Sequence, residues 1–348
     1  MPVVNHEALR TFAAQVLAAA GAPSEAAQIV ADHLVEANLA GHDSHGVIRL
    51  LQYCDHARSG QMNPKAEPAV VRQSPTTALV DGNLSWGPIA ARFAMNLAID
   101  KAQAHGVAAV SLRNAYHVGM VGVYPAEAAA KGLIGMAFCN VQGTGRVAPW
   151  GAREPRLGTN PIAIAVPTEG HPIVVDMATS AVAEGKVRVA KTEGTAVPLG
   201  WVLGPDGGFS TDPNDAYEQG ALAPLGGDQG HKGYCLSVAV DLLAGVLAGT
   251  PCGLMGNQYA NGLLFQVINP DHFCERDAFM QGVDNYSAYL KSAAPREGVE
   301  QVLLPGEIER QKKGQRLVEG VRIGAQLREQ LVALGASLGV SSEEVLGA

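Results

Sequence analysis

His45 and Arg49 lie four residues apart in the stretch 41–50, GHDSHGVIRL, and their chemistry suits a ligand that carries a carboxylate. A histidine can exchange a proton near neutral pH, and an arginine can hold a carboxylate through two hydrogen bonds. If 47–58 is helical, both share one stripe with Tyr53, because residues four apart lie on the same helical face. All three need polar partners when buried, so they are poor core residues. The pattern therefore predicts a pocket.

A helix C-terminus is the structural alternative for this stretch, with Gly41 following the last turn. It accounts for Gly41 and for His42, which we expect to be structural, but not for the serine, histidine and glycine that follow. A second histidine, His117, follows a predicted strand in the loop NAYHVG, and loops after strands commonly carry functional side chains. An ordinary surface turn explains that loop equally well.

Two further segments have the composition of a phosphate-binding site. Residues 225–230 form a Gly-rich loop that leads into His231 and Lys232 at the start of a predicted helix. Exposed N–H groups, the helix dipole and the lysine charge would converge there, although a flexible loop with a solvated lysine is the structural alternative. The run 172–180, PIVVDMATS, ends in hydroxyl groups and backbone amides that suit the same role.

The pattern G-x-G-x-x-A at 143–148 matches a dinucleotide-binding fingerprint but not its context. That fingerprint needs a helix whose N-terminus holds the pyrophosphate. Here Pro149, Gly151 and Pro155 follow, and this composition does not start a regular helix. The segment therefore predicts a loop rather than a Rossmann fold.

The composition is that of a globular protein, with 348 residues, 47% of them hydrophobic and 17% charged. The net charge of −8 argues against a nucleic-acid-binding face and gives no reason to expect an anionic membrane as partner. Five cysteines without a CxxC pair favour neither a disulfide framework nor structural zinc. The N-terminus lacks a signal-peptide pattern, and the apolar run 236–248 contains Asp241 and is too short to span a bilayer. We therefore expect a cytoplasmic protein.

Helical and strand patterns alternate along the chain, which predicts a mixed α/β fold. The predicted helices cover 6–20, 24–40, 88–104 and 232–249, and the tail 272–348 is mostly helical apart from a charged break at 295–316. The predicted strands include a pair within 69–81, one on each side of the helix that follows the NAYHVG loop, a hairpin within 161–179, and a run that ends at Pro270.

Seven segments together resemble the malate/L-lactate dehydrogenase family in order and spacing. They are DSHGVIRL, the YHVG loop, APWGAREPRLGTNPIAIAVPT, VVDMATSAVAEGKV, GALAPLGG, HKGY and LLPGE. The resemblance implies a non-Rossmann, nicotinamide-dependent oxidoreductase that is a homodimer of three-part subunits. We expect a helical unit of 1–72 and 295–348, an α/β unit of 73–140 and 262–294, and a cofactor-binding α/β unit of 141–261.

The resemblance also implies roles for individual residues. The family's acid/base histidine corresponds to His45 and its second histidine to His117, while substrate contacts fall on Arg49, Ser44 and Tyr53. No metal is expected. Contacts with NADH or NADPH fall on Val174, Val175, Asp176, Met177, Ala178, Thr179, Ser180, His231, Lys232, Pro305, Gly306 and Glu307.

Two segments depart from the family pattern. In the first, residues 228–230 are inserted before HKGY, and Cys235 directly after it replaces a usual glycine. In the second, Tyr116 precedes the second histidine, where asparagine or a small residue is more common. The insertion could re-aim the phosphate loop, and the phenol could narrow the pocket or supply a donor.

The expected reaction is hydride transfer between the nicotinamide and a small 2-oxo or 2-hydroxy acid, with histidine as acid/base; reduction of cyclic imino acids is the alternative. The resemblance implies a basic residue in hydroxy-acid dehydrogenases and an acidic one in imino-acid reductases at the position of Lys186, ten residues after Asp176, so Lys186 favours the oxo acid. A carboxylate there would better suit a cationic iminium. A solvated helical lysine is the structural alternative. Two other classes remain: a non-catalytic binding protein, and a metal-dependent hydrolase that uses His42, His45, His117 and His231.

Overall fold

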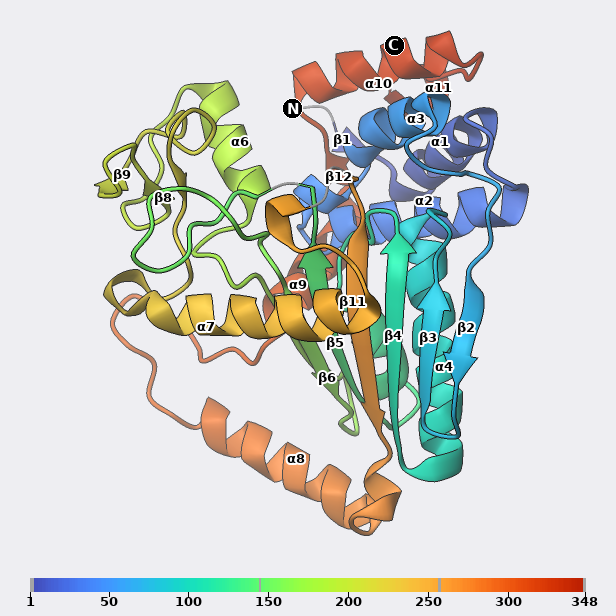
Figure 1. Cartoon of the computed structure of the whole chain (residues 1–348), viewed down its shortest axis with the longest axis vertical. Helices are drawn as coiled ribbons and strands as arrows, with labels where there is room; N and C mark the ends of the chain where they lie inside the picture. The colour runs from blue at the N-terminus through green and yellow to red at the C-terminus, as the bar shows by residue number, and fades with distance from the viewer. Residues whose placement is uncertain (1–2, 144, 256–257, 347–348) are drawn as a thin grey trace.

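A seven-stranded sheet forms the centre of the molecule in the computed structural model, which describes residues 3–143, 145–255 and 258–346 (Figure 1). In sheet order the strands are β2 (Ala69–Gln73), β3 (Thr77–Asp81), β4 (Val107–Ala115), β11 (Asn261–Ile268), β5 (Ile134–Val141), β6 (Ile162–Val166) and β7 (Ile173–Met177). Within this sheet only β3 and β4 run parallel, and every other neighbouring pair is antiparallel. This open, mixed sheet differs from the parallel Rossmann sheet, so the predicted non-Rossmann α/β class is confirmed.

The burial of each strand follows its place in the sheet. β11 reads GLLFQVI after its first residue and is almost wholly buried, as expected for a strand covered on both faces. β2 lies at the edge and exposes all five residues, including Arg72, which discourages pairing with another chain. Helices α4 (Gly87–His105) and α5 (Val123–Ala129) cover one face of the sheet, and α7 (His231–Val240) crosses the other (Figure 1).

A helical cluster lies at one end of the sheet and joins both ends of the chain (Figure 1). Strand β1 (Val3–Val4) pairs with β12 (Val321–Arg322), which holds the N-terminus next to the last helices. Buried side chains such as Leu34 and Leu331 share one core there. The helices of the cluster are α1 (His6–Ala19), α2 (Ser24–Leu39), α3 (Arg49–Ser59), α10 (Ala325–Ser337) and α11 (Glu343–Leu346).

A smaller unit lies beside the sheet around α6 (Glu184–Glu193). Its core includes Val147, Val187 and Leu222. A second sheet, with the order β10-β8-β9, belongs to this region, and its strands are β10 (Ala221–Leu222), β8 (Val202–Leu203) and β9 (Phe209–Ser210). The predicted division into three units stays a prediction. The strands β6 and β7, which were expected in the cofactor-binding unit, belong to the same seven-stranded sheet as β4 and β11.

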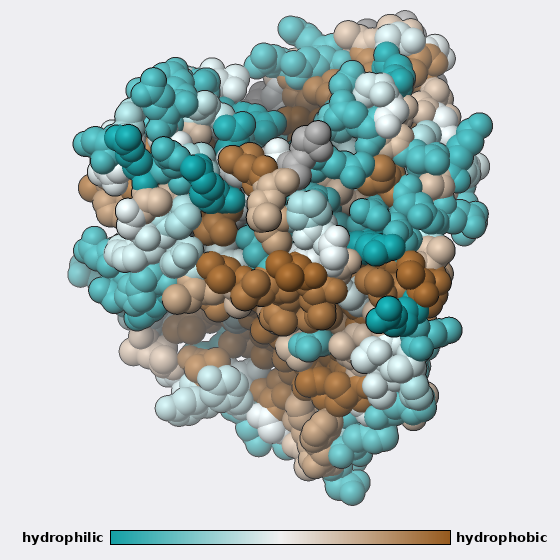
Figure 2. Space-filling model, in the orientation of Figure 1, coloured by the Kyte–Doolittle hydropathy of each residue, from teal (hydrophilic) through white to brown (hydrophobic). Residues whose placement is uncertain are grey.

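The helix that begins at His231 ends within one residue of its predicted end but is less regular than predicted. It continues from α7 as the π-helical segment η3 (Asp241–Gly245) and the 3-10 segment η4 (Val246–Ala248). By length and composition alone, the helical stretch His231–Met255 could cross a membrane, whereas the apolar run 236–248 of the sequence was expected to be too short. Core helices of soluble proteins pass the same test. Its exposed face forms an apolar band (Figure 2) of Leu236, Leu242, Leu243, Val246 and Leu247.

The C-terminal part corrects one prediction. The charged stretch 295–316 was expected to be a break, but α9 (Glu307–Glu319) begins inside it. Its charged residues are good helix formers, and Glu307 in its first turn accepts the backbone N–H of Leu304, which precedes the helix, at 2.9 Å. The preceding α8 (Arg276–Lys291) projects from the body and buries none of its residues (Figure 1). Short 3-10 turns lie at η1 (Asp43–His45), η2 (Gly227–Gln229), η5 (Gly253–Met255) and η6 (Pro270–His272).

The other predicted elements are confirmed within a few residues. They include the strand pairs β2–β3 and β6–β7, the helices α1, α2 and α4, and the helix that carries Arg49. The segment 143–148 is irregular where the structure describes it, as predicted, while Thr144 lies outside the described residues.

Candidate active site

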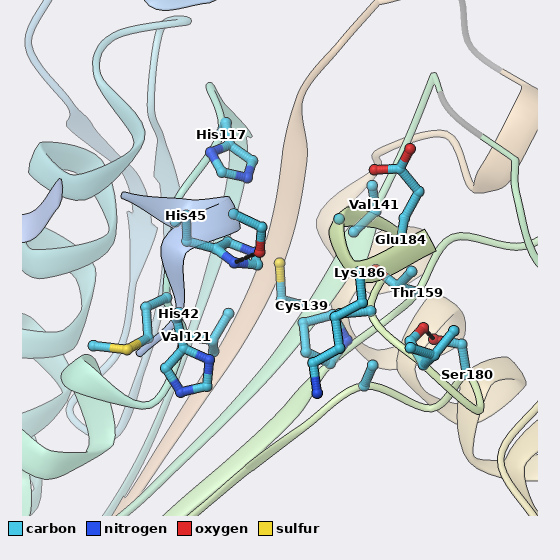
Figure 3. A pocket seen from close by; sticks show the side chains of 18 of the residues that line it. His42, His45, His117, Val121, Cys139, Val141, Thr159, Ser180, Glu184 and Lys186 are labelled. Atoms are coloured by element: carbon cyan, nitrogen blue, oxygen red, sulfur yellow. Dashed lines mark hydrogen bonds between the residues drawn. The ribbon is translucent and has the colours of Figure 1, made fainter. Parts of the chain in front are cut away.

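A cavity of about 800 Å³ separates the helical cluster from the α6 region (Figure 3), and its size is typical of a small-molecule site. One side, here called the histidine wall, consists of residues 42–56 that face the cavity together with the loop 117–121. The opposite side, here called the α6 wall, consists of the cavity-lining residues of 176–188. Cys139 of β5 lies between the two walls (Figure 3).

The turn that presents His45 is fixed by Asn38 of α2. The Asn38 side chain donates to Asp43 at 2.7 Å and accepts the backbone N–H of Val47 at 2.9 Å. Gly46 packs directly against this amide, where a Cβ would overlap it. The glycine of the SHG run is therefore required by packing, and the turn directs His45 into the cavity.

His45 is neutral and lies beside a cation. Its Nδ1 is 3.1 Å from Ser44 Oγ, and burial together with Arg49 lowers the pKa of the ring to about 3. Arg49 donates from Nε to the Ser44 carbonyl at 2.7 Å and from Nη1 to Gln52 at 2.8 Å. Within the described part of the chain no carboxylate pairs with Arg49, so it can bind an anion from solution.

His117 completes the histidine wall. Its ring stacks on that of His45 with centroids 5.7 Å apart and planes inclined by 16°. Burial holds its pKa well below the usual value, and Arg49 acts in the same direction. Behind it, Tyr53 is fully buried and places Oη 2.8 Å from Nδ1 of His117. The structure therefore brings two histidines with lowered pKa together with a guanidinium that has no ion-pair partner among the described residues.

The loop that carries His117 is held by three elements through alternate backbone N–H groups. The N–H of Val118 donates to the side chain of Asn261 in β11 at 3.0 Å. The N–H of Met120 donates to Nε2 of His33 in α2 at 3.1 Å. Gly122 then donates to Asp176 of β7 at 2.7 Å. Such anchoring fixes the loop before any ligand binds.

The α6 wall is more solvated. Lys186 is exposed to the cavity, and within the described residues it has no ion-pair partner. Glu184, by contrast, is neutralised by Arg188 at 2.8 Å and accepts the phenol of Tyr217 at 2.8 Å. The two walls touch at Gly185, where a Cβ would overlap the side chain of Ser44.

Comparison with known proteins identifies the family. Residues 4–332 match the family described as Malate/L-lactate dehydrogenase. The chain belongs to this family. It is 38% identical to a malate dehydrogenase of Pyrococcus horikoshii, with 97% of this chain and 96% of that protein covered.

Solved structures of relatives share the architecture. The sulfolactate dehydrogenase from Methanocaldococcus jannaschii is 36% identical with a TM-score of 0.91, and the match covers 99% of this chain and 100% of that one. The delta1-piperideine-2-carboxylate reductase from Pseudomonas syringae pvar. tomato is 31% identical with a TM-score of 0.82, over 96% and 100% of the two chains. The chain is therefore an oxidoreductase of the malate/L-lactate dehydrogenase family.

The residues predicted to contact the cofactor in this dehydrogenase separate into two groups. Asp176, Met177, Ala178 and Ser180 line the cavity. The others do not. Thr179 is fully buried, and its hydroxyl donates to the Asn160 carbonyl at 3.0 Å. The other predicted cofactor contacts that lie outside the cavity lining are Val174, Val175, His231, Lys232, Pro305, Gly306 and Glu307.

Two of these outlying sites have structural contacts of their own. Glu307 forms ion pairs with Lys291 at 2.8 Å and with Arg310 at 3.1 Å, which lower its pKa. His231 packs edge-on against Trp150 with ring centroids 5.9 Å apart, and the adjacent lysine is exposed.

The sequence reasoning missed several residues that line the cavity of the dehydrogenase. His42 faces the cavity with Nε2 3.7 Å from Glu309, although it was expected to be structural. Gln52 and His56 also line it, and their spacing of three and seven residues from Arg49 was a helical signal that could have found them. Among the described residues, no group of three or more His, Cys, Asp or Glu is placed to hold a metal.

Proposed function

We propose that this dehydrogenase transfers a hydride between NADH or NADPH and a small 2-oxo or 2-hydroxy acid. The observation that carries the proposal is the histidine wall, where the rings of His45 and His117 stack with centroids 5.7 Å apart, next to Arg49, which has no ion-pair partner among the described residues. The relatives named malate dehydrogenase and L-sulfolactate dehydrogenase support a 2-hydroxy acid as substrate.

In this proposal the protein handles the proton and the carboxylate. His45, neutral because of its lowered pKa, accepts the hydroxyl proton during oxidation and returns it during reduction. Arg49 holds the neighbouring carboxylate through a two-pronged bond and so selects the face of the substrate that reacts. His117 is the second acid/base group, and Ser44 orients His45 through its hydroxyl.

The residues of the cavity fit a dinucleotide. The nicotinamide, when bound, supplies the hydride donor or acceptor. The strand end Asp176–Ser180 would contact it from the α6 wall, where small residues leave room, and Lys186 and Arg146 offer positive charge without an ion-pair partner among the described residues. Lys232 remains a predicted phosphate contact, which cofactor titration of Lys232→Ala would test.

A homodimer in the cytoplasm is the proposed assembly and location. Two apolar surfaces support the dimer: the exposed band on α7, η3 and η4, and the projecting helix α8, where Tyr286 and Tyr289 are 59% and 72% exposed. Large exposed apolar patches mark interaction sites. Light scattering of the purified protein should give twice the monomer mass, and Leu247→Asp should lower it. A monomer that partitions into detergent would instead favour membrane association.

Reduction of cyclic imino acids is the alternative, supported by the similarity to the piperideine-2-carboxylate reductase. The deciding experiment measures kcat/KM for a panel of 2-oxo acids and five- and six-membered cyclic imino acids with both reduced cofactors. We expect a 2-oxo acid to be the best substrate. An imino acid that is better by tenfold or more would favour the alternative, and no turnover of any compound would favour a non-catalytic binding protein.

A further inference from the structure

Tyr53 lies behind His117 and not on the surface of the cavity. Its side chain is fully buried, and its Oη is 2.8 Å from Nδ1 of His117 and 3.3 Å from the backbone carbonyl oxygen of the same residue. A buried phenol needs hydrogen-bond partners, and both of these partners belong to His117. Tyr53 is therefore placed to orient the side chain of His117 rather than to contact a substrate.

One arrangement of protons lets the phenol use both partners at once. A phenol donates one proton and accepts through its oxygen. If the hydroxyl of Tyr53 donates to the His117 carbonyl, its oxygen accepts a proton from Nδ1. The imidazole then carries its proton on Nδ1 and keeps the lone pair on Nε2. The opposite arrangement, in which the hydroxyl donates to Nδ1, uses only one of the two partners.

We propose that Tyr53 is a positioning residue that holds His117 as the Nδ1-protonated tautomer, so that Nε2 is the atom that accepts and returns the substrate proton. This inference rests on the proposed function. The same contacts serve both charge states, because Nδ1–H donates to Oη and the hydroxyl donates to the carbonyl whether or not Nε2 carries a proton. The proton can thus move at Nε2 while the hydrogen bonds behind it stay unchanged, as in other histidines oriented by a third group.

The surroundings of His117 disfavour its protonated form, so that form needs an acceptor for Nδ1–H. Burial and nearby positive charge disfavour the imidazolium, and an acceptor for Nδ1–H opposes that effect. The charged or titratable groups around the ring are His33 of α2, His45 of η1, Arg49 and Tyr53 of α3, and Tyr259 before β11.

The test compares Tyr53→Phe with a matched variant, Tyr116→Phe. Tyr116 is equally buried in the same ring cluster, and its phenol lies 2.8 Å from Nδ1 of a different histidine, His56. Either variant removes one buried hydroxyl, so the loss of stability is controlled. Long-range 1H–15N spectra of the full-length protein with labelled histidines report the tautomers, and a His117→Gln variant identifies the signals of that ring.

We expect Nδ1-protonated His117 in the wild type and in Tyr116→Phe, and a mixed or Nε2-protonated ring in Tyr53→Phe. In the Tyr53 variant, kcat for the best 2-hydroxy acid should fall by about 10- to 100-fold with nearly constant cofactor Kd. The acidic limb of its kcat/KM profile should move to lower pH. In the Tyr116 variant, the tautomer of His117 and the position of the acidic limb should stay as in the wild type.

The proposal is overturned if the tautomer of His117 is the same in wild type and Tyr53→Phe, or if Nε2 carries the proton in the wild type. Equal losses of kcat in the two variants with unchanged tautomers would indicate a packing effect and would also overturn it. Because the spectra need no turnover, they decide the role of Tyr53 even if no compound in the substrate panel reacts, which is the result that would contradict the proposed function.

Discussion

The two walls of the cavity are built in different ways. On the histidine wall the functional groups are partly or fully buried, and protein atoms hold them in place: Ser44 contacts His45, Tyr53 contacts His117, and Gln52 contacts Arg49. On the α6 wall, Lys186 is exposed. A buried group that loses its partner bears the full cost of desolvation, whereas a solvated one exchanges that partner for water. Changes on the histidine wall should therefore have the larger effects.

The largest effect is expected for His45→Ala. A general acid–base group typically contributes about 10²- to 10⁴-fold to the rate, so turnover should fall by at least about 100-fold while the protein stays folded and binds cofactor. His105→Ala, which replaces an exposed histidine at the end of α4, is the control. Steady-state kinetics and cofactor fluorescence titration measure the two properties. Near-normal turnover in the His45 variant would assign the main proton transfer to His117.

Acid should weaken the helical side that supports the histidine wall. His33 is 6% exposed, and burial lowers its pKa to about 3, so the folded protein binds no proton there between pH 6.5 and 3 while the unfolded chain does. The free energy of unfolding therefore falls as the pH falls below about 6.5, by about 2–3 kcal/mol between pH 7.5 and 4.5 for this one residue.

Urea unfolding at several pH values checks this expectation. His33→Gln retains an acceptor for the Met120 N–H but does not titrate, so its stability should depend less steeply on pH than that of the wild type. Lys186→Gln on the α6 wall is the matched control and should keep the wild-type dependence. Equal slopes in wild type and His33→Gln would contradict the assignment.

Arg49→Leu should have the next largest effect, which is a loss of kcat/KM for substrates that carry a carboxylate. A hydrogen bond to a charged group contributes about 2 kcal/mol, so kcat/KM for a 2-oxo acid should fall about 30-fold. Arg49→Lys should recover only part of this, because an ammonium lacks the planar fork. The matching amide or ester, which has no carboxylate, should be affected little. An equal loss for acid and ester would mean that Arg49 acts through the position of Ser44 instead.

How far the sequence predicted this molecule depends on the range of the interactions involved. The helices and hairpins follow from local periodicity, and the spacing of His45 and Arg49 indicated a pocket before any fold was known. The position of Tyr53 behind His117 could not be predicted, because it depends on a contact between residues 64 positions apart. The loop anchors His33 and Asn261 were missed for the same reason, since they lie 87 and 143 positions from their partners.

Local patterns do not show which segments face the cavity, because that depends on contacts with the rest of the molecule. The helix N-terminus at Lys232 lies outside the cavity, so its predicted contact with a phosphate stays a prediction. His42 appeared structural in the sequence, but the turn at Asp43 places it next to Glu309 of a distant helix. Composition identifies what a segment can bind, and only the fold determines whether it faces the cavity.

Lys186 gives the smallest expected effect and the sharpest contrast between the walls. It faces the cavity and, unlike Arg188 on the same wall, has no ion-pair partner among the described residues, so reversing its charge should change substrate preference more than it changes the rate of the best reaction. In Lys186→Glu, the ratio of kcat/KM for oxaloacetate-like acids to kcat/KM for cyclic imino acids should fall roughly fivefold, which corresponds to about 1 kcal/mol. The reason is that the new carboxylate repels the second acid group of the oxo acid and attracts an iminium.

Lys186→Gln separates charge reversal from simple loss of the lysine and should give an intermediate ratio. Salt provides a second control, because the interaction of an exposed charge weakens as ionic strength rises, and the difference between the variants should shrink in 0.5 M salt. A ratio that is the same in all three proteins would mean that the α6 wall does not read the charge of the substrate. Discrimination would then belong to the histidine wall, where Gln52 and His56 lie beside Arg49 and line the cavity.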